Sequence, residues 1–228
     1  MKFQNRAHAG QVLAKMLDHF SGEENVVVLA LPRGGVPVAY EVASRLKAPL
    51  QVFLVRKLGA PGHEEFALGA IASGGIWYVN EDVVRQMELS RQEIQALVMR
   101  QREELDRRME AYGNEFSRDD LRGKTLVVVD DGLATGATMR VAVKALKKQH
   151  PEKIVVAIPV ASASTVREFR SHLEVDELIC AHSPEVFHAV GQWYEDFSQT
   201  SDEEVRELLI RARNELVPEP IPAWPGML

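Results

Sequence analysis

The chain has few of the residues that would supply covalent or electrostatic attachments. Cys180 is its one cysteine, so an intramolecular disulfide is excluded and a cysteine-based zinc site is not expected. Positive charge is also in deficit, because 27 lysines and arginines face 33 aspartates and glutamates, for a net charge of −6. This balance argues against bulk attraction to nucleic acids or anionic lipids, although a local basic pocket remains compatible with it.

Long apolar runs are missing as well. The longest run without a charged residue, residues 66–80, contains three glycines and is shorter than the roughly 20 residues that a membrane-spanning helix needs. Residues 1–20 mix lysine, arginine and aspartate with apolar residues, so we expect no signal-peptide core. The sequence therefore predicts a cytoplasmic protein that does not associate with membranes.

The 228 residues, 46% of them hydrophobic and 26% charged, have the composition of an ordinary globular protein. We predict one domain over residues 1–213. A tail over residues 214–228 holds four of the eleven prolines and is expected to be extended. The tail is expected to dock on the body of the protein or on a partner.

Short β-rich runs alternate with helical stretches, which is typical of an α/β fold with a mostly parallel sheet flanked by helices. Continuous apolar runs indicate strands buried on both faces. The expected strands are Asn25–Leu31, Leu50–Val55, Thr125–Val129, Ile154–Val160 and Glu177–Ala181, and helices are expected over residues 36–46 and 136–149.

Two segments interrupt this alternation. Residues 59–75 hold five glycines and predict a mobile loop or a loose hairpin. Residues 81–122 are dense in charge of both signs and predict a helical insertion, in which the capping-box pair Ser90 and Glu93 begins a helix that ends near Gly113. We expect its charged residues to form a solvated face. A second capping box, Ser201 with Glu204, predicts a helix through about Arg213.

The most informative segment is residues 127–138, VVVDDGLATGAT. A buried strand there brings Asp130 and Asp131 to its carboxyl end, where open α/β sheets bind ligands. A turn of small and hydroxyl residues follows and begins a helix, whose N-terminus favours anions. The carboxylates can accept hydrogen bonds from sugar hydroxyls, and the turn can bind a phosphate. A ribose 5-phosphate carries both kinds of group. The alternative is that the two aspartates only cap a turn.

This segment resembles the phosphoribosyl pyrophosphate (PRPP) motif of the type I phosphoribosyltransferases. It is neither a P-loop, since no Gly-Lys-Ser/Thr follows, nor a Rossmann fingerprint, since the glycine spacing differs. The likeness extends over most of the first 200 residues except the helical insertion. It is strongest to bacterial proteins that carry the name "putative phosphoribosyltransferase". The resemblance implies the type I fold with a C-terminal hood.

The resemblance also implies roles for particular residues. Asp130 and Asp131 would be catalytic. The 5-phosphate would be bound by Ala134, Thr135, Gly136, Ala137 and Thr138. In the family, a loop after the first strand binds pyrophosphate, often through a cis peptide, and a basic residue ends the second strand. The matching residues are Arg33, Gly34, Gly35, Arg56 and Lys57. The alternatives are a simple turn at residues 32–35 and solvent-facing cations at residues 56–57.

The family's flexible loop, which closes over the site, would correspond to residues 57–75. Its tip carries His63, Glu64 and Glu65, which either take part in proton transfer or are merely solvated. The sequence leaves this open.

The hood would select the acceptor, through Val190, Trp193, Tyr194 and Glu195. Aromatic rings stack on flat bases, and an acid can accept from ring N–H groups. Val190-Gly191 followed by Glu195 is similar to the base-binding stretch of hypoxanthine-guanine enzymes. At the position of Ala134, however, adenine- and uracil-type enzymes carry the alanine that this chain has. These indications conflict, so the base is undetermined. The alternative is that the aromatic residues only pack the core.

The implied reaction is transfer of 5-phosphoribosyl from Mg-PRPP to a nitrogen acceptor, a nucleobase of nucleotide salvage, with release of pyrophosphate. Mg²⁺ would be held mainly by PRPP, near Asp130 and Asp131, so no protein metal site is assigned with certainty. The alternatives are a PRPP-sensing regulatory protein with weak catalysis and an enzyme with a non-nucleobase acceptor. Expected partners are PRPP, a small-molecule acceptor and a second copy of the chain, but not nucleic acid.

Overall fold

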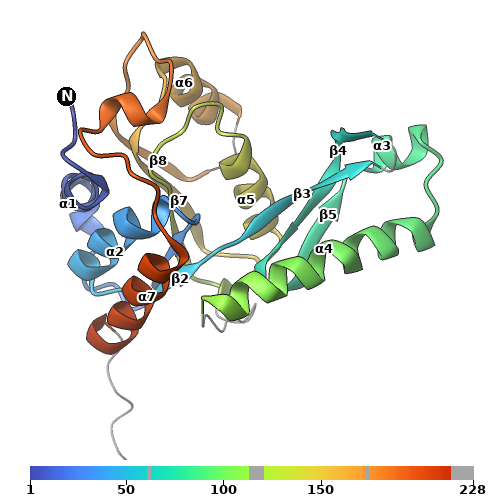
Figure 1. The fold of residues 1–228 in the computed structure, drawn as a ribbon, viewed down its shortest axis with the longest axis horizontal. Coiled ribbons are helices and arrows are strands. Elements are labelled where there is room, and N and C mark those ends of the chain that lie inside the picture. Colours follow the sequence, from blue (N-terminus) through green and yellow to red (C-terminus); the bar gives the residue numbers. More distant parts are fainter. Residues whose placement is uncertain (61–62, 113–120, 173–174, 217–228) are drawn as a thin grey trace, which may run out of the picture.

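A five-stranded parallel sheet lies at the centre of the molecule (Figure 1). The computed structural model describes residues 1–60, 63–112, 121–172 and 175–216. The strand order is β2-β1-β6-β7-β8. The strands are β1 (Val26–Ala30), β2 (Leu50–Val52), β6 (Thr125–Val129), β7 (Lys153–Val160) and β8 (Glu177–His182). The predicted α/β class with a mostly parallel sheet is thus confirmed.

Helices cover both faces of this sheet. The first face packs against α1 (Arg6–Met16), α2 (Gly35–Leu46) and α7 (Asp202–Leu216), and the second against α5 (Ala137–Lys147) and α6 (Ala163–His172). Val28 and Val127 belong to the first core cluster, and their neighbours Leu29 and Val128 to the second. Because successive side chains of a strand point to opposite faces, both must be apolar when helices cover both faces.

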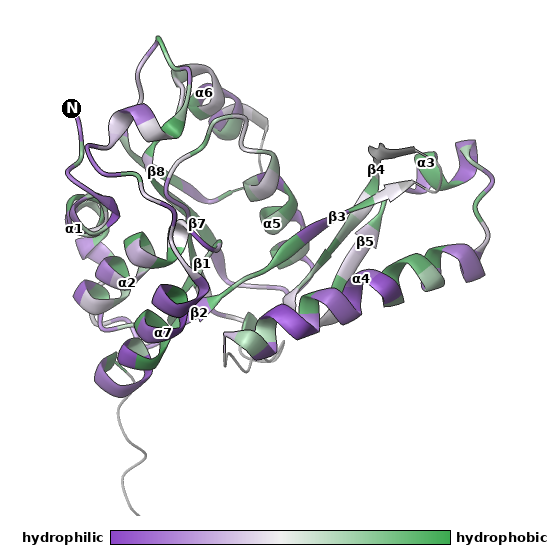
Figure 2. Cartoon of the chain, viewed as in Figure 1, coloured by the Kyte–Doolittle hydropathy of each residue, from purple (hydrophilic) through white to green (hydrophobic). Residues whose placement is uncertain are grey.

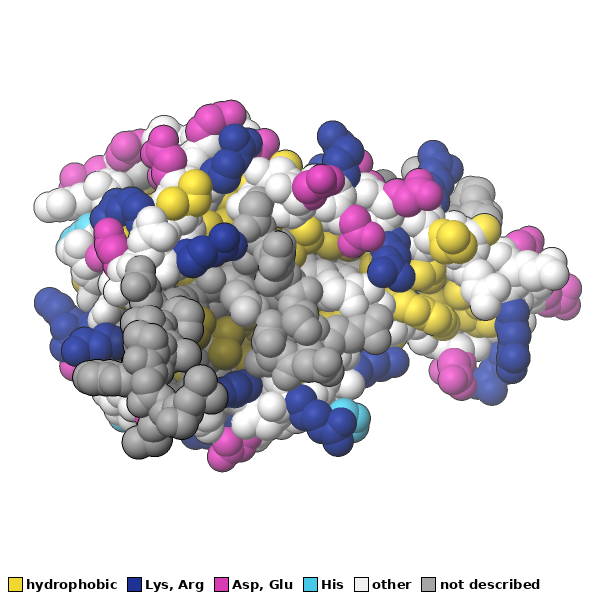
Figure 3. All heavy atoms as spheres, turned by 90° about the horizontal axis from the view of Figure 1, so that it is seen from below, with side chains coloured by type: hydrophobic (Ala, Val, Ile, Leu, Met, Phe, Trp, Pro, Cys, Tyr) yellow, Lys and Arg dark blue, Asp and Glu magenta, His cyan; other side chains and the backbone are white. Residues whose placement is uncertain are grey.

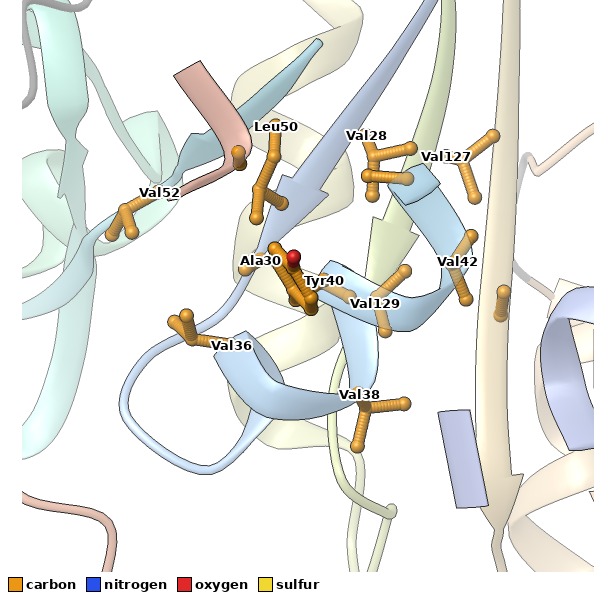
Figure 4. Close-up of a cluster of buried hydrophobic side chains, with 14 of the residues drawn as sticks. Val28, Ala30, Val36, Val38, Tyr40, Val42, Leu50, Val52, Val127 and Val129 are labelled. Atoms are coloured by element: carbon orange, nitrogen blue, oxygen red, sulfur yellow. The ribbon is translucent and has the colours of Figure 1, made fainter. Parts of the chain in front are cut away.

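Figure 4 shows the first of these clusters, in which Val36, Tyr40 and Val42 of α2 lie over the strand valines. The predicted helix over residues 36–46 is therefore confirmed. So is the helix after β6, which ends at Lys147, slightly before the predicted end. Helix α7 runs to Leu216, beyond the predicted end at Arg213, and Ser201 Oγ accepts a hydrogen bond from the Glu204 amide at its start (3.1 Å).

A second, antiparallel sheet projects from the body and forms an arm (Figure 1). Its strands are β3 (Val55–Ala60), β4 (His63–Ala72) and β5 (Ile76–Val79), followed by α3 (Glu81–Gln86) and α4 (Arg91–Ala111). A short 3-10 turn, Ser73–Gly75, joins β4 to β5. The glycine-rich stretch thus forms a hairpin. The side chains of His63, Glu64 and Glu65, and hence their predicted roles, lie outside the described residues.

Residues 81–111 are helical over α3 and α4, as predicted for this range, and the predicted capping box is complete: Ser90 Oγ accepts from the Glu93 amide, and the Glu93 carboxylate accepts from the Ser90 amide. Apolar and polar residues alternate along α4 (Figure 2), because only one face, including Ile94, Leu105 and Met109, is buried. The predicted end at Gly113 lies outside the described residues. Among the described helices, none is both long enough and apolar enough to cross a membrane.

The predicted strand Leu50–Val55 is wrong in its second half. Strand β2 ends at Val52, and β3 begins at Val55 in the other sheet. The change is fixed by buried Ser73, whose Oγ accepts from the Leu54 amide (2.8 Å) and whose own amide donates to the Leu54 carbonyl (3.0 Å). Arg56 and Lys57 therefore lie on the first strand of the arm and not at the carboxyl end of the parallel sheet.

The arm also exposes apolar side chains. Figure 3 shows hydrophobic groups gathered on the arm on the lower face of the molecule. Trp77 and Met99, exposed by 43% and 65%, line a cavity there together with Val98.

Candidate functional site

Two carboxylates stand at the carboxyl end of the central strand β6. Asp130 follows the fully buried Val129, and Asp131 comes next in the chain. The Asp131 amide donates to Asp130 Oδ1 at 2.8 Å, which turns the first carboxylate back toward the second residue. The predicted pair therefore lies at the edge of the sheet where parallel α/β folds bind ligands.

The loop after β1 packs directly against this pair. A Cβ atom at Gly34 would lie 2.0 Å from Asp131 Oδ2, and a Cβ at Gly35 would lie 3.0 Å from Asp130 Cα. A side chain at Gly34 would displace the Asp131 carboxylate, and one at Gly35 would displace the backbone of Val129 and Asp130. The preceding peptide bond, Pro32–Arg33, is cis, as the resemblance implies. The predicted pyrophosphate loop is thus brought into contact with the predicted catalytic residues.

Arg6 of helix α1 completes the surroundings of Asp131. Its Nε donates to Asp131 Oδ2 at 2.9 Å, and its Nη1 donates to the Ser198 carbonyl at 2.7 Å. The guanidinium also lies 3.9 Å from the centre of the Phe197 ring. The side chains of Arg6 and Asp131 are only 12% and 16% exposed, so this ion pair is largely removed from water.

Arg6 is a site residue that was not predicted from the sequence. Its partner is 125 positions away in the sequence, and Arg6 stands on the same face of α1 as the buried Ala9, Gly10 and Leu13. A lone arginine in the first turn of a helix carries no pattern that points to a carboxylate.

Burial and mutual repulsion control the ionisation of the two aspartates. Burial, followed by the charge of Asp131, raises the pKa of Asp130 well above its ordinary value of 3.8. Burial also raises the pKa of Asp131, but the Arg6 guanidinium acts in the opposite direction. The pair therefore favours the arrival of positive charge, whether from a proton, a cation or an electron-poor carbon.

The turn after the aspartates borders a cavity of about 200 Å³. All five residues predicted to bind the 5-phosphate line it, together with Asp130 and Val190. Its described lining comprises Asp130, Gly132, Leu133, Ala134, Thr135, Gly136, Ala137, Thr138, Met139 and Val190. The structure therefore brings the predicted phosphate turn, the first carboxylate and one hood residue to one place.

The turn is held from behind by side chains of the helices. Arg140 Nη2 donates to the Thr135 carbonyl (2.6 Å), and Thr165 Oγ1 donates to the Ala134 carbonyl (2.9 Å). Both contacts use acceptors of the turn. Gly136 has φ +69° directly before α5, and a Cβ there would lie 2.5 Å from Phe169 Cε2, so glycine is required.

The predicted pyrophosphate cations lie elsewhere. Arg33 lines a second cavity, between the β1–α2 loop and the end of α4, and its Nη1 is 3.8 Å from Asp202 Oδ1. Arg56 Nη1 is 3.6 Å from Glu104 Oε1 of α4, and Lys57 is exposed on β3. The structure thus does not bring Arg33 and Arg56 onto the aspartate pair but directs both toward the helical insertion.

The hood is a short 3-10 helix, Val190–Trp193, and the extended residues after it. Tyr194 is only 3% exposed, packs on Phe3 at 5.5 Å, and donates its hydroxyl to the Asp131 carbonyl (2.6 Å). Tyr194 is therefore buried in the core, as the alternative for the aromatic hood residues predicted. Burial also raises the pKa of its hydroxyl.

The other hood residues have different surroundings. Trp193 stacks on Phe187 at 6.4 Å and meets His182 edge-on at 4.8 Å, while Glu195 is exposed. Val190 alone among the four predicted acceptor residues lines the aspartate cavity. Our sequence analysis did not anticipate that Tyr194 anchors the backbone of Asp131.

The carboxylate pair after the central strand, the turn that begins α5 and the glycine loop against the carboxylates are arranged as the resemblance to the phosphoribosyltransferases implies. The chain belongs to this family: residues 4–195 match the model of the phosphoribosyl transferase domain.

Two curated relatives from Mycobacterium tuberculosis are "Putative phosphoribosyl transferase MT0597" (strain CDC 1551 / Oshkosh) and "Putative phosphoribosyl transferase Rv0571c" (strain ATCC 25618 / H37Rv). Each is 45% identical over 213 residues, which are 93% of this chain and 47% of the relative. The chain thus spans about half the length of the curated relatives it matches. The crystal structure of TT1426 from Thermus thermophilus is similar, with a TM-score of 0.79, 41% identity, and coverage of 92% of this chain and 99% of that one.

Proposed function

We propose that the protein transfers the 5-phosphoribosyl group of PRPP to a nitrogen acceptor, a nucleobase, and releases pyrophosphate. The observation that carries this proposal is the single cavity lined by Asp130 and by all five residues of the turn 134–138. A sugar phosphate needs hydroxyl acceptors and an anion cradle a few ångströms apart. Membership of the phosphoribosyl transferase family supports the same assignment.

In the proposed reaction, the bond from C1 of the ribose to the diphosphate oxygen breaks and a bond from C1 to the acceptor nitrogen forms. The diphosphate leaves with the electron pair and takes up the N–H proton that the acceptor loses. Asp130 and Asp131 accept hydrogen bonds from the ribose hydroxyls and stabilise the positive charge that develops on the sugar. Arg6 donates to one oxygen of Asp131 and thereby fixes the orientation of this carboxylate.

The residues also fit Mg²⁺, which the family implies. Mg²⁺ in phosphate sites is bound by one or two carboxylates and otherwise by substrate oxygens and water. Asp130 and Asp131 supply such a pair, while no group of three or more potential ligands gathers within the described part of the chain. When bound, the ion would supply neutralisation of the leaving diphosphate.

The test is release of pyrophosphate from Mg-PRPP by the purified chain with a panel of purine and pyrimidine bases. Release that depends on one base supports transfer and identifies the acceptor. If PRPP raises the melting temperature but no base causes release, the PRPP-sensing alternative is favoured. If PRPP causes neither, the proposal is wrong.

A variant pair assigns the activity to the site. Asp131→Asn should remove most of the turnover, because the amide cannot supply the negative charge, while Asp106→Asn on the exposed face of α4 should have no effect. A thermal melt of each variant checks that the fold is kept. Wild-type turnover in Asp131→Asn would contradict the role given to this carboxylate.

A further inference from the structure

The second cavity joins three segments that are far apart in the sequence. Its volume is about 390 Å³, and it lies between the cis-bonded Pro32–Arg33 pair, the last turn of α4 and the first residue of α7. The charged and polar groups that line it are Arg33, Arg107, Arg108, Tyr112 and Asp202. Among the described lining residues, three guanidinium groups thus face one carboxylate.

The arginine cluster at this cavity extends to Arg56 through a shared carboxylate, Glu104. Glu104, one turn back on α4, accepts from Arg107 (2.9 Å) and Arg108 (3.1 Å) and lies 3.6 Å from Arg56. Within the described part of the chain, four arginines therefore share two carboxylates, Glu104 and Asp202. The side chains of Arg107 and Arg108 are 73% and 54% exposed, so their remaining N–H donors are within reach of a ligand.

The backbone beneath these arginines is fixed. The Tyr112 hydroxyl donates to Asp202 Oδ1 (2.8 Å), and Arg206 Nε donates to the Ala111 carbonyl (2.9 Å), so α4 and α7 are tied together at the cavity. Leu105 and Met109 of the same turns are buried in the main core. Burial, then the hydrogen bond to Asp202, raises the pKa of Tyr112 to about 12, so its hydroxyl stays a donor. Because the backbone is fixed, only the arginine side chains have to become ordered when a ligand binds.

We infer that this cavity is a binding site for a diphosphate or polyphosphate group, in which Arg107 and Arg108 of the helical insertion act together with Arg33. Arginine forks match phosphate oxygens and form charge-assisted hydrogen bonds with them. Arg33 connects this site to the aspartate pair, because the next residue, Gly34, lies against Asp131.

Two sources could supply such a group: the diphosphate of PRPP itself, or a separate phosphate-bearing molecule. That PRPP is the source rests on the proposed function, whereas the anion site itself does not. Asp202 is the group that an arriving anion would replace, because its contact with Arg33 is loose at 3.8 Å. Neutralising this carboxylate should therefore strengthen anion binding.

The test uses the full chain and inorganic pyrophosphate, with binding followed by titration calorimetry at fixed ionic strength. Replacing both Arg107 and Arg108 with Gln should weaken binding by about tenfold or more, since each guanidinium contributes a charge-assisted contact. A matched control replaces Arg100 and Arg102 with Gln, which removes the same charge from exposed positions of the same helix. This control should bind as the wild type does. Asp202→Asn, which keeps an acceptor for Tyr112, should bind more tightly.

Competition distinguishes the two sources. If pyrophosphate is displaced by PRPP but binds together with ribose 5-phosphate, the cavity receives the diphosphate of PRPP. If PRPP leaves pyrophosphate bound, the cavity serves a separate anion. Both results support the site.

The inference is overturned if the wild type binds no pyrophosphate, if the Arg107/Arg108 variant binds it as the wild type does, or if the control loses as much. None of these results bears on transfer, whose failure is read from PRPP, the base panel and Asp131→Asn. The two proposals therefore fail separately.

Discussion

Gly34 is the position at which the smallest change should disturb the site most. Its backbone is right-handed helical (φ −60°, ψ −29°), so alanine fits without backbone strain. Any cost of Gly34→Ala must therefore come from what the added Cβ meets. That contact is Asp131 Oδ2 at 2.0 Å, while ordinary contact starts at 3.4 Å, so the carboxylate has to move by about 1.4 Å.

This displacement has two consequences. The carboxylate leaves the 2.9 Å contact with Arg6 Nε, and overpacking of a rigid interior costs about 1–3 kcal/mol of unfolding free energy. A misplacement of about 1 Å in a catalytic group also reduces turnover by about a hundredfold. We expect Gly34→Ala to show both effects, with a folded protein at room temperature.

A double-mutant cycle with Asp131→Ala separates this explanation from a general defect. Once the carboxylate is gone, the new Cβ has room, so Gly34→Ala should cost little stability in that background. Urea unfolding of the four proteins measures the coupling. If Gly34→Ala costs the same with and without the Asp131 carboxylate, the steric reasoning is refuted.

Three further variants test the electrostatics around the pair. Arg6→Gln should lower the free energy of unfolding by about 3 kcal/mol, because it leaves a buried carboxylate without its cation. The substitution should also raise the pKa of Asp131, so the acid limb of a kcat/KM profile should move to higher pH. Asp130→Asn should stabilise the fold at neutral pH. Folding raises the pKa of Asp130 above its ordinary value of 3.8, so the folded wild type binds more protons than the unfolded chain does. The wild type therefore loses stability as the pH rises from 3.8 through that raised pKa, whereas the variant does not. Urea unfolding against pH measures this, and a parallel pH course for both proteins contradicts it. Tyr194→Phe should cost about 1 kcal/mol in a thermal melt, because the Asp131 carbonyl loses its donor; an unchanged melt would argue against that bond.

The central layer could be predicted because its pattern is local. Runs such as Val26–Ala30 and Thr125–Val129 are apolar at every position, or nearly so, and a strand covered on both faces requires this. The order of strand, two acids and a small-residue turn likewise identifies the end of β6 as a ligand site before any contact is known.

The parts that sequence reasoning missed depend on contacts between remote residues. The chain leaves the parallel sheet after Val52 because Ser73 binds the backbone of Leu54. No residue pattern near Leu54 predicts this contact. Arg107 and Arg108 belong to a charge run that is typical of a solvated face. Their place beside Arg33 follows from how α4 packs on the body, which periodicity does not report.

The contacts between residues 3–6 and residues 193–198 have a consequence for synthesis on the ribosome. Phe3 exchanges backbone hydrogen bonds with Trp193 and Glu195, and Arg6 reaches the Ser198 carbonyl. Residues 3–6 are translated long before these partners, which are among the last of the described residues to emerge. A nascent chain can thus assemble the β1–β6–β7 layer early. Until Ser198 has left the exit tunnel, the bridge from the N-terminal helix through Asp131 to the hood cannot close.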